Sequence, residues 1–309
     1  MKICKMNLGN PFLRRVPFNN KERGNYIMAN IITSRKINNH DVVKTTKINN
    51  ELRIIHNSYH NTVPRMLKSN SNFGINVKTG EVIEFNRSTN RSQRMCDFKR
   101  SLSMLRDIIK LNVVDLEKCF FITLTYEDNI SDREVLKKDF NNFIRKFRRR
   151  FGNCEYINAI EYQNRGALHC HLIVIFDEIP TFTITNDDIK KCWKHGSSNI
   201  GPVTSAEADA KYLTNFLFEY KVEKEDSDYI FKTKKQRKGE RVCYYPSHSR
   251  LFNCSQGIKR PEVIKNIPYS EALSMFNSIE LTNALSIYND DGNIVTIENY
   301  KIKNEKEVC

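Results

Sequence analysis

The sequence predicts an α+β fold in which a central antiparallel β-sheet is flanked by helices. Amphipathic helical stripes alternate along the chain with short runs of β-branched and aromatic residues. Two of these runs, 156–163 and 168–176, are separated by the turn signal Asn164-Arg165-Gly166. Strands joined so closely pair antiparallel, and amphipathic helices beside them need a sheet on which to bury their apolar faces.

The first helix is predicted to end near Lys110. Its apolar residues recur at alternating spacings of three and four, as in a helix that buries one face: Met95, Phe98, Leu102, Leu105 and Ile109. The run FFITLTY at 120–126 comes next. It is short, aromatic and β-branched, which is typical of a buried strand.

The second helix is predicted to have an apolar and a basic face. Ser131 and Glu134 have the spacing of a capping box, which predicts where the helix begins. Its apolar stripe consists of Leu136, Phe140, Phe143, Ile144, Phe147 and Phe151, and arginines occupy the opposite face.

Two further helices and two further strand elements are predicted downstream. A short helix covers 187–195 with Gly196 at the C′ position, and a longer one covers 205–220 with Ser205 as its N-cap. Residues 241–245 are predicted to form a strand. The run NDDG at 289–292, between two alternating segments, predicts a hairpin.

These patterns divide the chain into three parts. Residues 91–262 carry the periodic elements and are predicted to form the main domain. Residues 1–90 are polar, Asn-rich and weakly periodic, which predicts an irregular N-terminal extension whose role is not legible. Residues 263–309 are predicted to be a C-terminal accessory segment that contains the hairpin.

The charge favours a polyanionic partner. Lys and Arg number 50 against 36 Asp and Glu, for a net charge of +14. The excess is clustered within 145–150 and 232–241, and such clusters suit phosphates because binding releases condensed counterions. The alternative is a solvated basic surface without a partner. A membrane is disfavoured, because no basic amphipathic helix with exposed aromatics is evident.

The cysteines and the N-terminus favour a reducing, intracellular location. Nine cysteines without a CxxC pair argue against a disulfide framework and a thiolate zinc site. The N-terminal residues lack the apolar core of a signal peptide, and no run of 18 apolar residues exists. We therefore expect a cytoplasmic protein.

The candidate metal ligands are His169, His171 and Glu161. On a strand, residues two apart face the same side, so the two imidazoles project together. Glu161 lies opposite them if the hairpin register places all three on one face, which we expect to be a face that helices do not bury. Gln163 shares the strand parity of Glu161 and is a lesser candidate. The alternative is a pair of packed, hydrogen-bonded histidines.

Tyr212 is the candidate nucleophile on the helix predicted at 205–220. A tyrosine hydroxyl can attack phosphorus and hold the transferred group covalently. The alternative is that Tyr212 and Tyr220 are core residues of that helix with solvated hydroxyls.

These parts, in this order, resemble the HUH endonucleases, and among them the rolling-circle replication initiators of bacterial phages and plasmids. The run 121–126 resembles the first family motif. The run EYQNRGALHCH at 161–171 resembles the second, Glu-x-Gln-x-Arg-Gly-x-x-His-U-His. The runs 193–196 and 210–214 resemble the approach to the tyrosine motif, and 255–261 resembles a Ser-x-Gly-x-Lys-x-Pro tail. The resemblance spans about residues 91–262.

The resemblance implies a nuclease domain that nicks one DNA strand. Mg²⁺ or Mn²⁺ held by His169, His171 and Glu161 would polarise the phosphate. Tyr212 would attack it, leaving a 5′-phosphotyrosine and a free 3′-OH. The implied partner is single-stranded or hairpin origin DNA, with a host helicase and polymerase as further candidates. The candidate DNA-binding residues are Arg145, Arg148, Arg149, Lys211, Lys232, Lys234, Lys235 and Arg237.

The tyrosine motif departs from the family pattern. Relatives commonly have Tyr-x-x-Lys-Tyr, whereas Asn215 stands here where the lysine is expected. Lys211 can reach toward the site instead. Alternatively Tyr220 is the nucleophile, with Lys224 one helical turn beyond it, or the chain binds an origin without cutting it.

Two other functions remain open. A transposase or a relaxase of the same HUH class would use the same chemistry on another DNA. A non-catalytic module with an RRM-like sheet would instead stack bases on aromatic residues such as Phe121 and Tyr126. Loss of activity with EDTA and a covalent DNA adduct would distinguish an enzyme from such a module. The oligomeric state is not legible from the sequence.

Overall fold

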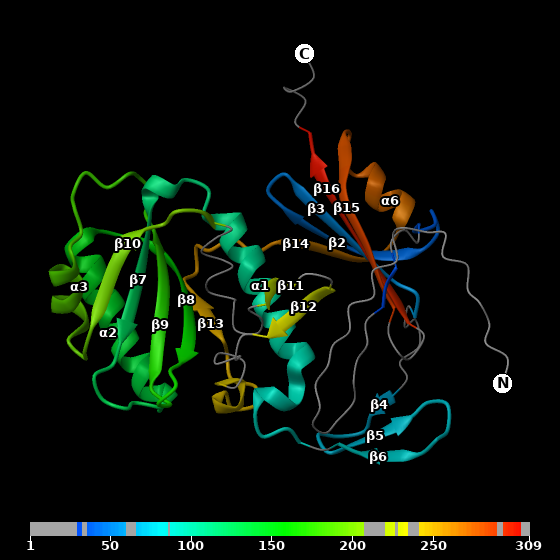
Figure 1. The fold of residues 1–309 in the computed structure, drawn as a ribbon, viewed down its shortest axis with the longest axis horizontal. Helices are drawn as coiled ribbons and strands as arrows, with labels where there is room; N and C mark the ends of the chain where they lie inside the picture. Colours follow the sequence, from blue (N-terminus) through cyan, green and yellow to red (C-terminus); the bar gives the residue numbers. More distant parts are fainter. Residues whose placement is uncertain are drawn as a thin grey trace. The chain divides into compact units, whose positions relative to one another are not determined.

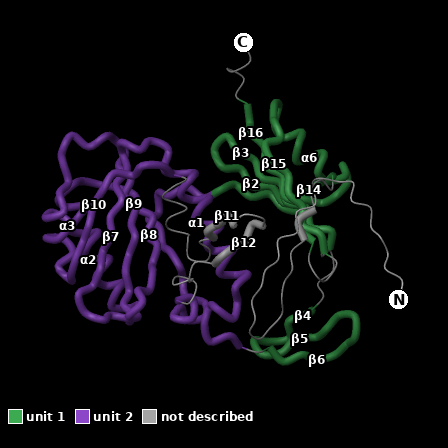
Figure 2. Tube along the Cα trace, viewed as in Figure 1, with its two compact units in different colours: residues 1–85, 261–309 green, residues 86–260 purple. Residues whose placement is uncertain are grey.

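The structure is a computed structural model, and it divides into two compact units (Figure 1). Residues 1–85 and 261–309 form unit 1, and residues 86–260 form unit 2 (Figure 2). The structure describes 30–32, 36–59, 66–85, 87–206, 220–225, 228–233, 241–288 and 293–303; of 30–32, 220–225 and 228–233 it describes the backbone.

Unit 2 is built on a five-stranded antiparallel sheet in the order β10-β7-β9-β8-β13. The strands are β7 (Cys119–Thr125), β8 (Glu155–Tyr162), β9 (Leu168–Ile175), β10 (Ser198–Pro202) and β13 (Phe252–Cys254). The central strands β7, β8 and β9 fall within a residue or two of the segments predicted from sequence. The α+β fold class with a central antiparallel sheet is confirmed.

Helices cover both faces of this sheet. The helices are α1 (Met95–Asn112), α2 (Arg133–Phe151) and α3 (Asn186–Trp193), with the 3₁₀ turns η1 (Arg91–Arg94) before α1 and η2 (Leu116–Lys118) before β7. One face carries Cys170, Leu172 and Val174 of β9 and packs against the apolar stripe of α2 and against α3. The other face carries Ile173, which packs with Ile157 of β8 against the second half of α1. Burying these two apolar layers holds the strands of the sheet in place.

Two predicted helix ends are wrong. The α2 N-cap is Asp132, whose carboxylate accepts a hydrogen bond from the Glu134 backbone N–H at 2.8 Å, so Ser131 lies outside the helix. The left-handed C-cap of α3 is Lys194, with φ 65°, rather than a glycine. Gly196 instead has φ 143°, and a Cβ there would lie 2.5 Å from the Thr125 carbonyl oxygen. Gly196 is therefore required by the close approach of β7.

Two other predicted elements differ in type. Residues 241–245 do not form the predicted strand, because Arg241–Tyr244 form the 3₁₀ turn η3. Val242 and Tyr245 are both buried, and a 3₁₀ turn places residues three apart on one side. Tyr220, predicted at a helix end, begins β11 (Tyr220–Glu225), which pairs with β12 (Asp228–Thr233). Of the helix predicted at 205–220, the structure describes a helical Ala206, and 207–219 lie outside the described residues.

Unit 1 joins segments from both ends of the sequence in a six-stranded sheet, β1-β15-β16-β3-β2-β14. The prediction of an irregular 1–90 is wrong for β2 (Val42–Ile48) and β3 (Glu51–Asn57), which pair with each other. The expected hairpin strands are present as β15 (Ile279–Tyr288) and β16 (Ile294–Ile302), although the turn at 289–292 lies outside the described residues. The remaining strands are β1 (Asn30–Ile32) and β14 (Glu262–Pro268), with helix α6 (Tyr269–Ser274). A separate small sheet contains β4 (Met66–Lys68), β5 (Phe73–Asn76) and β6 (Val82–Glu84).

The division into units differs from the three predicted parts. Unit 2 spans 86–260, where 91–262 was expected, and the N-terminal and C-terminal segments belong to one unit rather than two. No helix in the described part of the chain is long and apolar enough to span a membrane.

Candidate metal centre

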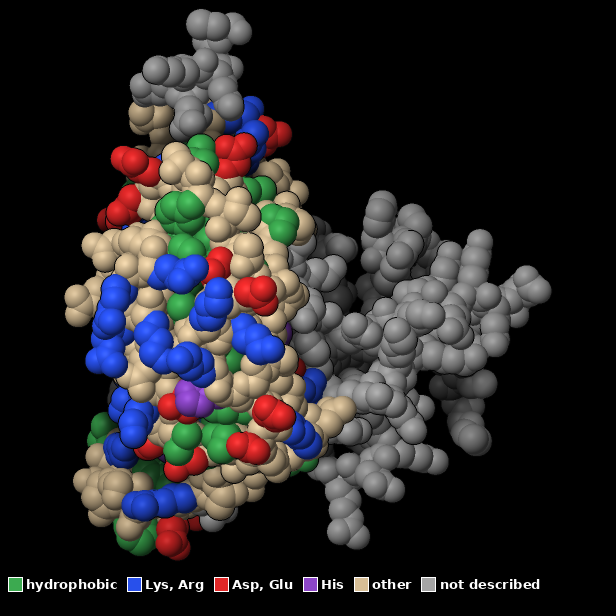
Figure 3. Space-filling view, turned by 90° about the vertical axis from the view of Figure 1, so that its left-hand side faces the viewer, with side chains coloured by type: hydrophobic (Ala, Val, Ile, Leu, Met, Phe, Trp, Pro, Cys, Tyr) green, Lys and Arg blue, Asp and Glu red, His purple; other side chains and the backbone are tan. Residues whose placement is uncertain are grey.

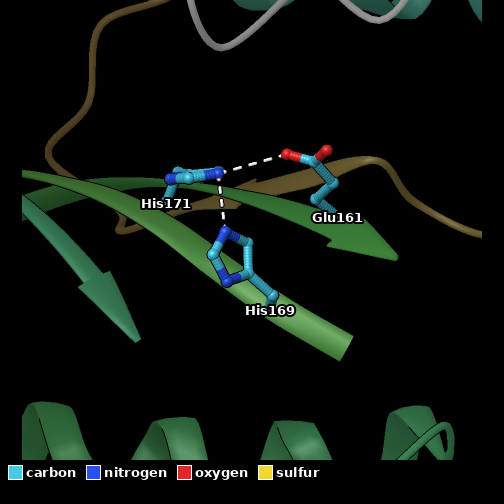
Figure 4. Close-up of side chains that lie close together, drawn as sticks. All are labelled: Glu161, His169 and His171. Carbon is cyan, nitrogen blue, oxygen red and sulfur yellow. Dashed lines mark hydrogen bonds and ion pairs between the residues drawn. The ribbon is translucent and has the colours of Figure 1, made fainter. Parts of the chain in front are cut away.

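The three candidate ligands meet at one end of the β8–β9 hairpin (Figure 4). Glu161 on β8 is paired directly with His169 on β9, and His171 follows two residues later on the same face. His171 Nε2 lies 2.8 Å from His169 Nε2 and 3.1 Å from Glu161 Oε2. One ligand atom from each residue lies within 4.8 Å of the others, so a single cation between them can contact all three.

Strand β7 orients both imidazoles. Thr125 and Thr123 are paired with His169 and His171 in the sheet register. Their Oγ1 atoms lie 3.0 and 3.3 Å from the respective Nδ1 atoms. Because these contacts occupy Nδ1, the Nε2 atoms are the ones that face the centre, which is how metal-bound histidines are usually fixed.

Arg241 of η3 holds the carboxylate, and sequence reasoning missed this residue. Its Nη2 lies 3.0 Å from Glu161 Oε1, while its Nη1 donates to the Tyr162 carbonyl at 2.6 Å. Glu161 Oε1 is therefore engaged by Arg241, and Oε2 faces His171. No local sequence signal connects residues that are so far apart along the chain, so this contact required the fold.

The site is more enclosed than predicted. His171 is 4% exposed and Glu161 5%, whereas His169 is partly exposed. The prediction of a face free of helices is wrong, because α1 packs on Ala159, Ile157 and Ile173 of the same face. The apolar contacts of α1 lie farther along the strands, so the hairpin end itself is lined by the polar residues. A charged group buried there needs a partner, and each of the three ligands has at least one.

Cys170 stands between the two histidines but belongs to the opposite face. It is fully buried in the α2 layer. Burial raises the pKa of its thiol to about 12, so the thiol remains protonated at neutral pH. Cys170 therefore fills the core and is unsuited to metal ligation, in agreement with its reading as the hydrophobic residue between the histidines.

Gln163 does not join the cluster. Its backbone closes the hairpin turn with Ala167 and Gly166, and its side-chain oxygen accepts from Arg165 Nε at 3.1 Å. Tyr212 lies outside the described residues. Ala206, six positions before Tyr212, packs on the same layer as α1. Tyr220 is described only as the first backbone position of β11.

The predicted DNA-binding residues fall into three groups. Arg145 and Arg149 lie on α2, with Arg149 exposed, whereas Arg148 is tied to the Cys154 carbonyl at 2.6 Å and lies over Tyr156. Lys232 lies in β12. Lys211, Lys234, Lys235 and Arg237 lie outside the described residues.

Sequence reasoning missed a second basic surface on α3. Lys190, Lys191 and Lys194 line a hollow of about 820 Å³ that also includes Ser197 and Ser198, which lead into β10. Figure 3 shows Lys and Arg side chains gathered on this side of unit 2. The missed signal was the spacing of the three lysines around the end of a helix, where the helix dipole favours cations without requiring a ligand.

The donor set fits a divalent transition ion better than Mg²⁺. Two imidazole nitrogens and one carboxylate oxygen suit Mn²⁺ and its neighbours, while Mg²⁺ prefers oxygen ligands. Three protein ligands leave coordination positions for water or for substrate oxygens, as a catalytic site requires. A divalent ion would also balance the carboxylate in this enclosed site.

A small α+β domain with a His–x–His strand and an opposing glutamate is a class of unit suited to phosphate chemistry. Residues 119–220 match a family model described as "Replication-associated protein". The matched segment is about a third of the chain and runs from β7 to the first residue of β11. This match supports a role in replication initiation. Comparison with curated proteins and with solved structures found no match.

Proposed function

We propose that the chain is a rolling-circle replication initiator of the HUH endonuclease type, which nicks one DNA strand at an origin. The observation that carries the proposal is the convergence of Glu161, His169 and His171 at one hairpin end. The match of residues 119–220 to a replication-associated family supports the biological setting independently.

The proposed cofactor is a divalent cation, Mn²⁺ or Mg²⁺, held by His169 Nε2, His171 Nε2 and Glu161 Oε2. When bound, it would supply positive charge to the non-bridging oxygens of the scissile phosphate. The protein's own part is to hold these ligands in place. Thr123 and Thr125 keep the Nε2 atoms inward, and Arg241 keeps one carboxylate oxygen engaged so that the other is available.

The proposed nucleophile is Tyr212, with Tyr220 as the alternative. Its hydroxyl oxygen forms a bond to phosphorus and its proton passes to solvent. The bond from phosphorus to the 3′ oxygen breaks, and that oxygen leaves as a 3′-OH after taking up a proton. The product is a 5′-phosphotyrosine, whose bond energy allows the strand to be rejoined later without ATP.

The proposed substrate is single-stranded or hairpin origin DNA, with its backbone along the basic residues of α2 and 232–237. A host helicase and polymerase are proposed to follow at the exposed 3′-OH. A transposase or relaxase would carry out the same step, so the DNA substrate distinguishes these functions. The exposed Arg149 on α2 supports electrostatic tracking of a phosphate backbone.

The test is incubation of the full chain with oligonucleotides from its own replicon, with and without Mn²⁺. We expect a protein–DNA band that survives boiling in detergent, requires the metal and disappears in Tyr212→Phe. Tyr220→Phe is the matched control, and loss of the band there instead would assign the nucleophile to Tyr220. Salt-sensitive binding without any covalent band would identify the chain as a binding module instead.

A further inference from the structure

A second cavity lies on the opposite face of the sheet from the metal centre. It occupies about 480 Å³ between the first turns of α2 and the edge formed by β8 and β13. Asn158 and Ile160 line it, and they alternate along β8 with Ala159 and Glu161 of the metal-centre face. The cavity is therefore separate from the proposed nicking site, and its size is that of a small-ligand pocket.

Three buried polar atoms in this cavity have no hydrogen-bond partner. They are Asn158 Oδ1, Asn253 Oδ1 and Arg133 Nη1. Within the described residues only two other side-chain atoms share this condition, and neither of those residues lines the cavity. Asn158 is 1% exposed. Buried polar atoms are normally satisfied, so this concentration indicates that something polar occupies the cavity.

The roles of two of these groups are fixed by their surroundings. The Asn158 side chain hydrogen-bonds to Cys170, which lowers the pKa of that thiol against the stronger effect of burial, so the amide N–H group acts there as the donor. Its oxygen is therefore the atom left for the cavity. Arg133 uses Nη2 to donate to the Arg250 carbonyl at 2.5 Å, which leaves Nη1 as the donor in the cavity.

The remaining walls are apolar on one side and cationic at the edge. Leu136, Phe140 and Ile160 supply the apolar surface. Exposed Arg250 and Lys137 lie at the rim, with Lys137 paired to Glu134 at 3.2 Å. An apolar slot with a few convergent polar atoms and a cationic rim suits a flat heterocycle that carries a phosphate.

We propose that this cavity binds a single nucleobase, with guanine as the preferred base. Two carbonyl-type acceptors and one guanidinium donor complement a base edge with two donors and one acceptor. Guanine presents N1–H and the N2 amine as donors and O6 as the acceptor. Thymine has one donor on that edge, and cytosine and adenine each offer a single donor group, the exocyclic amine. The base comes from a free nucleotide or from a residue of bound single-stranded DNA.

The test titrates the full chain with the four deoxynucleoside monophosphates by calorimetry. We expect dGMP to bind saturably and more tightly than the other three, and its affinity to fall about tenfold or more in Asn253→Leu and Asn158→Leu. Asn142→Leu, on α2 but outside the cavity lining, is the control and should bind like the wild type. Fluorescence of Trp193, the single tryptophan, checks that each variant is folded, and Asn253→Leu carries the test if Asn158→Leu is not.

A second arm distinguishes the two sources of the base. A short oligothymidylate with one guanine is compared with free dGMP, and tighter binding of either, if lost in Asn253→Leu, supports the cavity and identifies the source. Equal binding of all four nucleotides, no saturable binding, or binding unchanged in both leucine variants would overturn the proposal. Ordered water would then satisfy the three atoms.

Discussion

Replacing Arg241 by Met removes one partner of a buried ion pair. Arg241 and Glu161 are 12% and 6% exposed at the side chain and lie 3.0 Å apart. Removal of one partner leaves a buried carboxylate without its guanidinium, and such changes typically cost about 3–5 kcal/mol. The same substitution also removes a donor to the Tyr162 carbonyl. We therefore expect Arg241→Met to lower the free energy of unfolding of unit 2 by about this amount in metal-free buffer.

The assay is urea denaturation followed by Trp193 fluorescence. Trp193 is the single tryptophan and is 1% exposed within unit 2, so its signal reports that unit separately from unit 1. The double variant Arg241→Met, Glu161→Gln should recover most of the loss, because it no longer buries an unpaired charge. Saturating Mn²⁺ should partly restore Arg241→Met but not the double variant.

The control is Arg149→Met, since Arg149 is exposed on α2. It should change stability by about 0.5 kcal/mol or less. A loss below about 1 kcal/mol for Arg241→Met, or no recovery in the double variant, would refute the reasoning that Arg241 acts by balancing and orienting Glu161.

Three further predictions rest on particular contacts. Thr125→Val should weaken Mn²⁺ binding about tenfold, because His169 loses the group at Nδ1; calorimetry with unchanged affinity would contradict this. Gly196→Ala should lower the unfolding free energy by about 2–5 kcal/mol, because its Cβ would meet the backbone of β7, while Gly201→Ala, with open space, should not; equal midpoints in urea would count against it. At pH 8 a thiol reagent should modify exposed Cys96 and Cys243 and spare Cys170, whose raised pKa keeps the thiol protonated until about pH 12; mass spectrometry of modified Cys170 in the folded chain would be the contrary result.

Much of unit 2 could be predicted because its signals are local. The β8–β9 hairpin follows from two apolar runs around Asn164-Arg165-Gly166, and strand alternation alone places His169 and His171 on one face. The register that sets Glu161 opposite His169 follows from the same short turn. The three candidate ligands were therefore predictable from one short stretch of sequence.

What was missed depends on contacts between distant segments. Arg241 reaches Glu161 only because η3 packs beside the end of β8, which no spacing in the sequence reveals. Unit 1 was missed for a related reason: β3 pairs with β16, which lies near the other end of the chain. The β2–β3 hairpin did carry a local signal, since β-branched runs flank Asn49-Asn50 and Asn49 adopts φ 51°. The low periodicity of its surroundings obscured it.

The most direct test of the central claim is pulsed electron paramagnetic resonance of one equivalent of Mn²⁺ bound to the full chain. We expect one bound ion with hyperfine coupling to two imidazole nitrogen nuclei. One coupling should disappear in His169→Ala and one in His171→Ala, and binding should weaken in Glu161→Ala. A spectrum without nitrogen coupling, or one that is the same in all three variants, would contradict a metal centre built from these residues.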